Sequence, residues 1–218
     1  MDLTRKQWEV VNSVREENPK ILILSGAKRA GKTHVAILLF LGMVADFENE
    51  GVSFIIGGAT YSSIWRNILN DMETILSRDI KLDKTNAFTL FGNKIYVFDG
   101  SKSDSWKKAR GFTAAGALLN EATALHDTFV KEVLSRCSYK GAKIIMDTNP
   151  ENPMHSVKTD YIDHDGQVLD SGRLNIRSFH FTLADNNFLD PEYVESIIAS
   201  TPSGMFTDRD IYGKPIAA

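Results

Sequence analysis

The fold class of this chain is indicated by the stretch Gly26-Ala27-Lys28-Arg29-Ala30-Gly31-Lys32-Thr33. It satisfies the pattern G-x-x-x-x-G-K-[ST], in which glycines let a loop wrap closely around phosphate groups. A short, apolar, β-branched run at 21–25 precedes it and predicts a buried strand. A longer apolar stretch follows and predicts a helix from Lys32 to about Asn49. Strand, glycine loop and helix in this order are the context that the pattern needs, whereas an ordinary glycine turn would not require it.

The chemistry expected of this loop is the binding of ATP with Mg²⁺. Lys32 should reach the β- and γ-phosphates, and the hydroxyl of Thr33 should be offered to Mg²⁺. The helix N-terminus adds partial positive charge, and the loop's backbone N–H groups face the phosphates. The residues predicted to bind the nucleotide in this way are Gly26, Ala27, Lys28, Arg29, Ala30, Gly31, Lys32 and Thr33.

Helix and strand patterns alternate along the chain on both sides of the loop. Helices are predicted over 4–17, 60–76 and 127–137, and strands over 52–56, 117–120 and 142–148. We expect a hairpin at the sheet edge, formed by strands 88–91 and 94–98 and joined by Gly92 and Asn93. The composition of the basic stretch 101–110 predicts a surface loop. This alternation of strands and helices, together with the loop, predicts an α/β protein of the P-loop NTPase class with a mainly parallel central sheet flanked by helices.

The composition and the pattern of predicted elements change after Pro150. A polar stretch runs to Gly172, and a strand over 174–182 and two short helices follow. We therefore expect residues 1–150 to form the ATPase core and residues 151–218 to form a small lid subdomain.

An ATPase needs acidic groups at the end of a strand near the loop. The run Ala117-Leu118-Leu119 ends in Asn120 and Glu121. Asn120 stands where an aspartate is expected for the metal, and it can reach Mg²⁺ or its water shell only as a neutral carbonyl. Glu121 is then the carboxylate that orients and deprotonates water. The alternative is a solvated strand end.

The strand 144–147 also ends in polar residues, Thr148 and Asn149, followed by proline. Ligands bind beyond the carboxyl ends of strands in such sheets, so these two residues are placed to sense the γ-phosphate. Plain turn chemistry is the competing interpretation.

Composition limits the setting and the partners. Lys and Arg total 25 against 28 for Asp and Glu, so DNA contact, if any, must be local. A single cysteine, Cys137, excludes an internal disulfide. The longest apolar run, 35–44, is too short to cross a bilayer, and no signal pattern opens the chain, so an intracellular protein without a membrane partner is expected.

Several segments together resemble one family, the large terminase subunit of tailed bacteriophages. They are LTRKQ near the start, GAKRAGKT, GALLNEAT, MDTNP, NNFLDPEY and FTDRDIYGKPIAA. The resemblance implies a motor that packages double-stranded DNA into the procapsid, with the portal protein and the small terminase subunit as partners. It also implies the host cytoplasm, and a homo-oligomeric ring when assembled, with a monomer in isolation as the alternative state.

The resemblance also assigns residues. It implies that Gln7 contacts adenine, that Lys28 or Arg29 is the basic loop residue near the phosphates, and that Thr148 with Asn149 couples hydrolysis to movement. Asn120 departs from the family's usual aspartate. The sequence stops where the family's nuclease domain would start, so an isolated ATPase portion or an unusually short subunit is expected.

Arg110 ends the basic stretch and has three interpretations. It belongs to a solvated charged loop, or to a DNA-contacting patch with Trp106, or it acts in trans on the ATP of a neighbour in the ring. Two other functions stay open for the whole chain. One is a nucleotide-binding clamp with little hydrolysis. The other is a P-loop phosphotransferase, although no arginine-rich lid is present.

Overall fold

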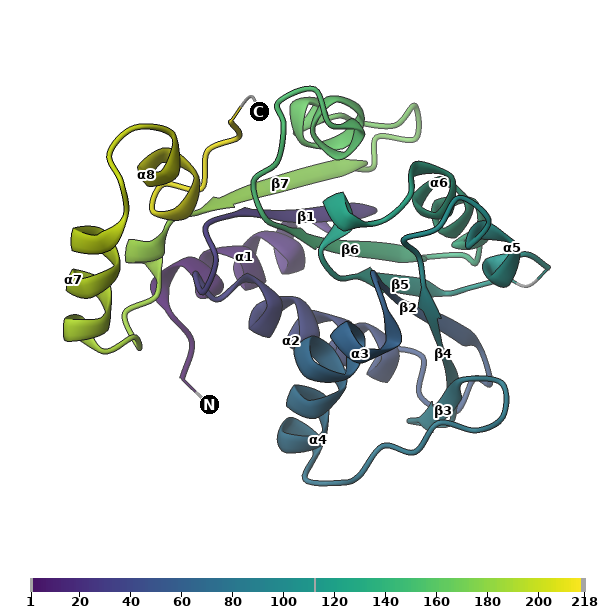
Figure 1. Ribbon diagram of the computed structural model, residues 1–218. Helices are drawn as coiled ribbons and strands as arrows, with labels where there is room; N and C mark the ends of the chain where they lie inside the picture. Colours follow the sequence, from purple (N-terminus) through teal and green to yellow (C-terminus); the bar gives the residue numbers. More distant parts are fainter. Residues whose placement is uncertain (1, 112, 217–218) are drawn as a thin grey trace.

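The computed structural model describes residues 2–111 and 113–216, and its centre is one twisted sheet with helices on both faces (Figure 1). The strands are β1 (Ile21–Gly26), β2 (Ser53–Gly58), β3 (Ala87–Leu90), β4 (Asn93–Asp99), β5 (Gly116–Leu119), β6 (Lys143–Thr148) and β7 (Ile176–Phe181). The α-helices are α1 (Arg5–Glu17), α2 (Lys32–Ala45), α3 (Tyr61–Ile64), α4 (Asn70–Leu76), α5 (Trp106–Ala109), α6 (Asp127–Arg136), α7 (Pro191–Ser200) and α8 (Met205–Asp210). Two π-helical segments occur, Trp65–Leu69 and Val157–Tyr161, with short 3₁₀ turns at Ala122–Ala124, Ile162–His164 and Leu183–Asp185.

The strand order is β3-β4-β2-β5-β6-β1-β7, and every neighbouring pair is parallel except β3 with β4. This confirms the predicted α/β class with a mainly parallel sheet. The carboxyl ends of β1, β5 and β6 therefore lie at one edge of the sheet, where ligands bind in folds of this kind.

Two apolar cores lie on opposite faces of the sheet. The first is built mainly from α2 and the 61–76 helix, with Phe40 and Phe54 among its fully buried side chains. The second is built around α6 and includes the fully buried Phe129, whose ring lies close to Gly57 on β2 and to Gly100. Because both faces are covered, all four residues of β5 are buried, as expected for a central parallel strand.

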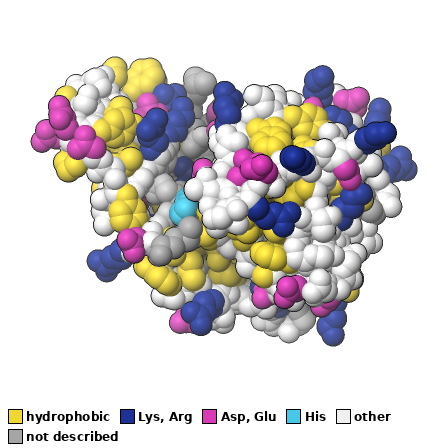
Figure 2. All heavy atoms as spheres, turned by 90° about the horizontal axis from the view of Figure 1, so that it is seen from below, with side chains coloured by type: hydrophobic (Ala, Val, Ile, Leu, Met, Phe, Trp, Pro, Cys, Tyr) yellow, Lys and Arg dark blue, Asp and Glu magenta, His cyan; other side chains and the backbone are white. Residues whose placement is uncertain are grey.

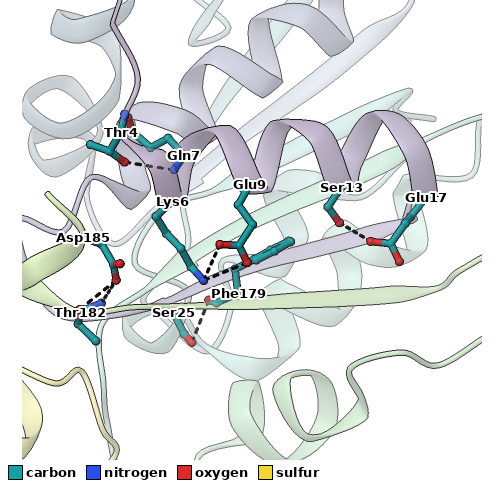
Figure 3. A network of polar contacts seen from close by, with 10 residues as sticks. All are labelled: Thr4, Lys6, Gln7, Glu9, Ser13, Glu17, Ser25, Phe179, Thr182 and Asp185. Carbon is teal, nitrogen blue, oxygen red and sulfur yellow. Dashed lines mark hydrogen bonds and ion pairs between the residues drawn. The ribbon is translucent and has the colours of Figure 1, made fainter.

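Helix α1 begins as its sequence predicts. The Thr4 hydroxyl accepts the Gln7 backbone N–H at 3.1 Å, and the Gln7 side-chain oxygen accepts the Thr4 N–H at 2.8 Å (Figure 3). This reciprocal pair satisfies two N–H groups that a helix start otherwise leaves unpaired. Asn18 in the left-handed region ends the helix.

The hairpin β3–β4 is confirmed, with β3 at the sheet edge, but its turn differs from the prediction. Asn93 is the first residue of β4 and is buried, so the turn is Phe91-Gly92. The reason is that the Asn93 side chain donates to the Phe47 carbonyl at 2.8 Å and so ties this strand to the segment after α2.

Two stretches expected to be irregular contain helical segments. Helix α5 lies within the basic stretch 101–110, and the π-helical segment Val157–Tyr161 lies within the polar stretch after Pro150. Among the described residues, no helix combines the length and apolar character that crossing a membrane requires.

The division of the chain at residue 150 stays a prediction. Strand β7 belongs to the same sheet as β1, and α7 and α8 lie beyond that edge (Figure 1). Met1, Phe112, Ala217 and Ala218 lie outside the described residues, so the outer limits of the predicted parts do too. On the face seen from below, basic, acidic and hydrophobic side chains are interspersed (Figure 2).

Candidate functional site

The loop between β1 and α2 has positive φ angles at three residues, of which two are glycines. Gly26 and Gly31 have φ of 128° and 90°, and a Cβ on Gly26 would collide with the Phe181 carbonyl oxygen. That same oxygen accepts the Ala27 N–H at 2.9 Å, so this N–H has a partner on β7. Arg29, at φ 57°, holds the left-handed conformation without being glycine. Such residues concentrate at functional sites because the strain needs support from the surrounding structure.

Lys32 opens α2 and is almost fully buried. Its ammonium donates to the carbonyls of Gly26 and Ala27, at 2.8 and 2.5 Å, and to the Asn149 side-chain oxygen at 3.3 Å. Burial lowers the pKa of Lys32 to about 8, although the carboxylates of Asp147 and Glu121 oppose the shift. A buried cation held mainly by neutral carbonyls favours the arrival of an anionic ligand.

A cleft of about 900 Å³ lies over the loop. The loop, the tips of β5 and β6, the π-helical segment Trp65–Leu69 and the stretch after β7 all contribute to its walls. The lining residues are Lys28, Arg29, Ala30, Gly31, Lys32, Thr33, His34, Arg66, Asn67, Asp71, Asn120, Glu121, Asp147, Asn149, Asn186 and Leu189. The fold thus brings most of the predicted site residues into one cavity.

The tips of β5 and β6 meet in a hydrogen-bonded group. The Asn120 amide donates to both carboxylate oxygens of Asp147, at 2.9 and 3.0 Å, and the Glu121 backbone N–H donates to Asp147 Oδ1 at 2.7 Å. The Asn120 side-chain oxygen accepts from Asn67 at 3.0 Å. Glu121 is itself left-handed, with φ 50°, and its side chain lines the cleft.

Asp147 was not among the residues predicted from the sequence. The available signal was its place in the run MDTNP, next to the two residues assigned as coupling groups. Arg66 and Asn67 were missed as well, because nothing in the sequence marks the π-helical turn that carries them. Such turns are rare and often occur at functional sites.

Thr148 and Asn149 extend in different directions. Asn149 lines the cleft and contacts Lys32, whereas the Thr148 hydroxyl lies 2.9 Å from the Thr123 hydroxyl just after Glu121. The β6 tip therefore touches both the loop and the segment that carries Glu121, while the coupling role of Thr148 and Asn149 stays a prediction.

Gln7 lies beneath the loop rather than in the cleft. Its Nε2 donates to the Gly31 carbonyl at 2.9 Å, its Oε1 belongs to the cap of α1, and its side chain is almost fully buried. The contact with adenine stays a prediction, and it would require Gln7 to exchange at least one of these partners.

The basic residues differ in position. Lys28 and Arg29 line the cleft, and the Arg29 guanidinium lies over the Tyr193 ring, 5.3 Å from its centroid. Arg110 is exposed, lies over the Trp106 ring at 5.5 Å, and does not line the cleft of its own chain.

A divalent ion bound with a nucleotide fits the donors of this cleft. Among residues 2–111 and 113–216, no cluster of three or more His, Cys, Asp or Glu side chains is placed to hold a metal by itself. Mg²⁺ in nucleotide sites commonly needs only one or two protein ligands, because phosphates and water complete its shell. The Thr33 hydroxyl and the carboxylates of Asp147 and Glu121 are oxygen donors of the required kind.

The sheet order, the loop after β1 and the acidic tips of β5 and β6 define a protein of the P-loop NTPase class. The family described as "Terminase large subunit, T4likevirus-type, N-terminal" matches residues 23–216, and the chain belongs to this family.

Solved structures agree with this membership. The large terminase of a thermophilic bacteriophage, in complex with ADP, is 29% identical with a TM-score of 0.80, over 97% of this chain and 53% of that one. The same terminase with ATP-gamma-S gives 28% and 0.78, over 97% and 52%, so this chain spans about half the length of these relatives. The ATPase domain of the Thermus phage P74-26 large terminase shares the fold at 12% identity, with a TM-score of 0.67 over 99% and 94%. A comparison with curated proteins finds no match.

Proposed function

We propose that this chain is the ATPase of a viral DNA-packaging motor, which hydrolyses ATP with Mg²⁺ to drive double-stranded DNA into a procapsid. The observation that carries the proposal is the cleft, in which the phosphate-binding loop faces Glu121. Family membership and the likeness to the thermophilic phage terminase bound to ADP and to ATP-gamma-S support it.

In this proposal the loop binds the triphosphate. Backbone N–H groups between Gly26 and Thr33 contact its oxygens, and the Lys32 ammonium exchanges its carbonyl partners for the β- and γ-phosphates. Lys28 and Arg29 add positive charge at the cleft wall. The Thr33 hydroxyl would be among the ligands of Mg²⁺, and the metal would supply positive charge to offset the charge that develops on the β- and γ-phosphate oxygens. Gln7 serves the adenine end.

Glu121 is the group proposed to orient and deprotonate the attacking water. Its left-handed backbone places the side chain at the cleft while its N–H is fixed by Asp147. Thr148 and Asn149 respond to loss of the γ-phosphate, because Asn149 contacts Lys32 and Thr148 contacts Thr123.

The proposed setting is a homo-oligomeric ring in the host cytoplasm, working with the portal protein and the small terminase subunit. Arg110 lies outside the cleft of its own chain, so in this proposal it reaches the ATP of a neighbour. With a net charge of −3, DNA binding depends on a local surface rather than on the overall field.

The test compares two variants that separate binding from chemistry. Lys32→Ala should abolish ATP hydrolysis and weaken nucleotide binding, since it removes the charge that the phosphates need. Glu121→Gln should bind ATP like the wild type while losing hydrolysis by roughly 10²- to 10⁴-fold. Binding is followed with a fluorescent ATP analogue and hydrolysis by phosphate release. Normal turnover in Lys32→Ala would refute the site, and normal turnover in Glu121→Gln would mean that another group is the base.

A second function, a nucleotide-operated clamp with little hydrolysis, is favoured by one observation. The neutral Asn120 stands at the strand tip where an aspartate is usual, and both its polar groups already have protein partners. Phosphate release by the wild type over many turnovers, with Mg²⁺ present, distinguishes an enzyme from a clamp.

A further inference from the structure

Asp147 is a deeply buried carboxylate in the wall of the cleft, with 2% of its surface exposed. A carboxylate is costly to bury as an anion unless hydrogen bonds or opposite charges stabilise it. The partners of Asp147 therefore indicate why the residue is there.

Its hydrogen-bond partners are uncharged N–H donors, although the nearby Lys32 ammonium also attracts its charge. Both oxygens accept from the Asn120 amide, and Oδ1 also accepts the Glu121 N–H. Within the described part of the chain, no ion pair joins Asp147 to a lysine or arginine. An ionised carboxylate has about four acceptor positions, of which these bonds use three, so one oxygen position remains for a further partner.

The strand register explains why Asn120 and Asp147 meet. Leu119 on β5 is paired with Met146 on β6, so the next residues along the two parallel strands are Asn120 and Asp147. A carboxylate on either strand would thus occupy nearly the same part of the sheet edge. A carboxylate on both would place two negative charges in direct contact, which prevents both from being ionised together.

We propose that Asp147 supplies the negative charge that this site offers to the nucleotide-bound Mg²⁺, and that Asn120 is a positioning residue that orients the Asp147 carboxylate. The single carboxylate of this pair therefore lies on β6 rather than on β5. This inference rests on the proposed function, because it assumes that the cleft binds nucleotide with a divalent ion.

The proposal revises the role expected for Asn120. The sequence led us to expect that Asn120 reaches Mg²⁺ through its carbonyl, but that oxygen accepts from Asn67. On that expectation, Asn120→Asp would strengthen Mg²⁺ binding. The contact with Asp147 leads to the opposite result, since the new carboxylate would repel the existing one or share a proton with it.

An exchange of the two residues tests the idea. The variants are Asp147→Asn, Asn120→Asp and the double variant Asn120→Asp/Asp147→Asn, which keeps one amide and one carboxylate but reverses their strands. The readout is binding of Mn²⁺ to the ADP-loaded protein, measured by electron paramagnetic resonance, with ADP affinity without metal as the reference. Thermal unfolding reports on folding.

We expect Asp147→Asn to lose roughly 10- to 100-fold in Mn²⁺ affinity, the range found when groups around a metal are changed, while metal-free ADP binding is kept. Asn120→Asp should also weaken Mn²⁺ binding, and the double variant should recover to within a few-fold of the wild type. A purely structural Asp147 would instead lower the unfolding temperature and leave Mn²⁺ affinity unchanged. That result, or a stronger Mn²⁺ affinity in Asn120→Asp, would overturn the proposal.

If Asp147→Asn does not fold, the double variant decides, since it restores the hydrogen-bonded pair. Recovered Mn²⁺ binding in the folded double variant supports the assignment of Asp147. Loss of Mn²⁺ binding in that variant overturns the proposal. Wild-type phosphate release tests the proposed function separately. If the wild type binds Mn²⁺ with ADP but never turns over ATP, the proposed function fails while the assignment of Asp147 stands.

Discussion

The two sides of the cleft are built in different ways. One side, from Gly26 to Thr33, is a continuous segment whose conformation is set by its own glycines and by the start of α2. The other side joins Asn120 and Asp147, which are 27 positions apart and meet through strand register. In the continuous segment, neighbouring residues determine where each functional group lies. In the opposite wall, the carboxylate of the pair could stand on β5 or on β6 and still lie at the same edge of the sheet.

Arg110 should have the largest effect, although it belongs to neither side of its own cleft. In an assembled ring, Arg110→Ala should lower ATP turnover by roughly 10³-fold or more, because a guanidinium at the γ-phosphate stabilises the transition state. Mixing Arg110→Ala with Glu121→Gln should recover activity, since a mixed ring places an intact arginine against an intact glutamate. Phosphate release from each protein alone is the control. Full activity of assembled Arg110→Ala would exclude the trans role.

Gly26→Ala should break the continuous side of the cleft. The new Cβ would collide with the Phe181 carbonyl oxygen, at a φ of 128° that side chains rarely adopt. We expect a loss of about 1–3 kcal/mol or more in unfolding free energy, together with a loss of nucleotide binding. Gly42→Ala is the matched control, because nothing lies near a Cβ there. Chemical denaturation of both variants gives the comparison, and equal stabilities would show that the loop adapts.

The contrast also explains what could be predicted from the sequence. The loop, the alternation of strands and helices and the edge hairpin follow from local patterns, and the structure confirms them. Asp147, Asn67 and the partners of Gln7 did not follow, because each depends on a contact between segments far apart in the chain. A one-residue change of register between β5 and β6 would separate Asn120 from Asp147. Because both strands are buried on both faces, their sequences lack the apolar–polar alternation from which register could be read.

Gln7 offers a smaller test, since it supports the loop from below. Gln7→Ala removes the side-chain half of the α1 cap and the bond to the Gly31 carbonyl but keeps the backbone bond to the Thr4 hydroxyl, so a loss of about 1 kcal/mol in stability is expected. Thr4→Ala removes the cap hydroxyl and leaves the Gly31 contact. If Gln7 also contacts adenine, Gln7→Ala should lose more affinity for ATP than for inorganic triphosphate, and Thr4→Ala should not. Equal losses for both ligands would confine Gln7 to supporting the loop.

Cys137 provides the smallest effect and a reference point away from the cleft. Its thiol is buried in the core beside α6, and burial raises the pKa of Cys137 to about 12. The native thiol should therefore resist iodoacetamide at pH 8, since the reactive thiolate is nearly absent, while the unfolded chain reacts readily. Between pH 9 and 12 the unfolded thiol loses its proton and the folded one keeps it, so this group lowers stability as pH rises.

Labelling of Cys137 then reports opening of the whole domain rather than changes at the cleft. Lys32→Ala should label as slowly as the wild type if its effect is confined to the nucleotide site. Gly26→Ala should label faster, by about tenfold for each 1.4 kcal/mol lost in unfolding free energy, because the loop backbone is bonded to β7 and hence to the sheet. Mass spectrometry of the labelled protein measures both rates. Rapid labelling of the folded wild type would show that the core beside α6 opens on its own, independently of the loop.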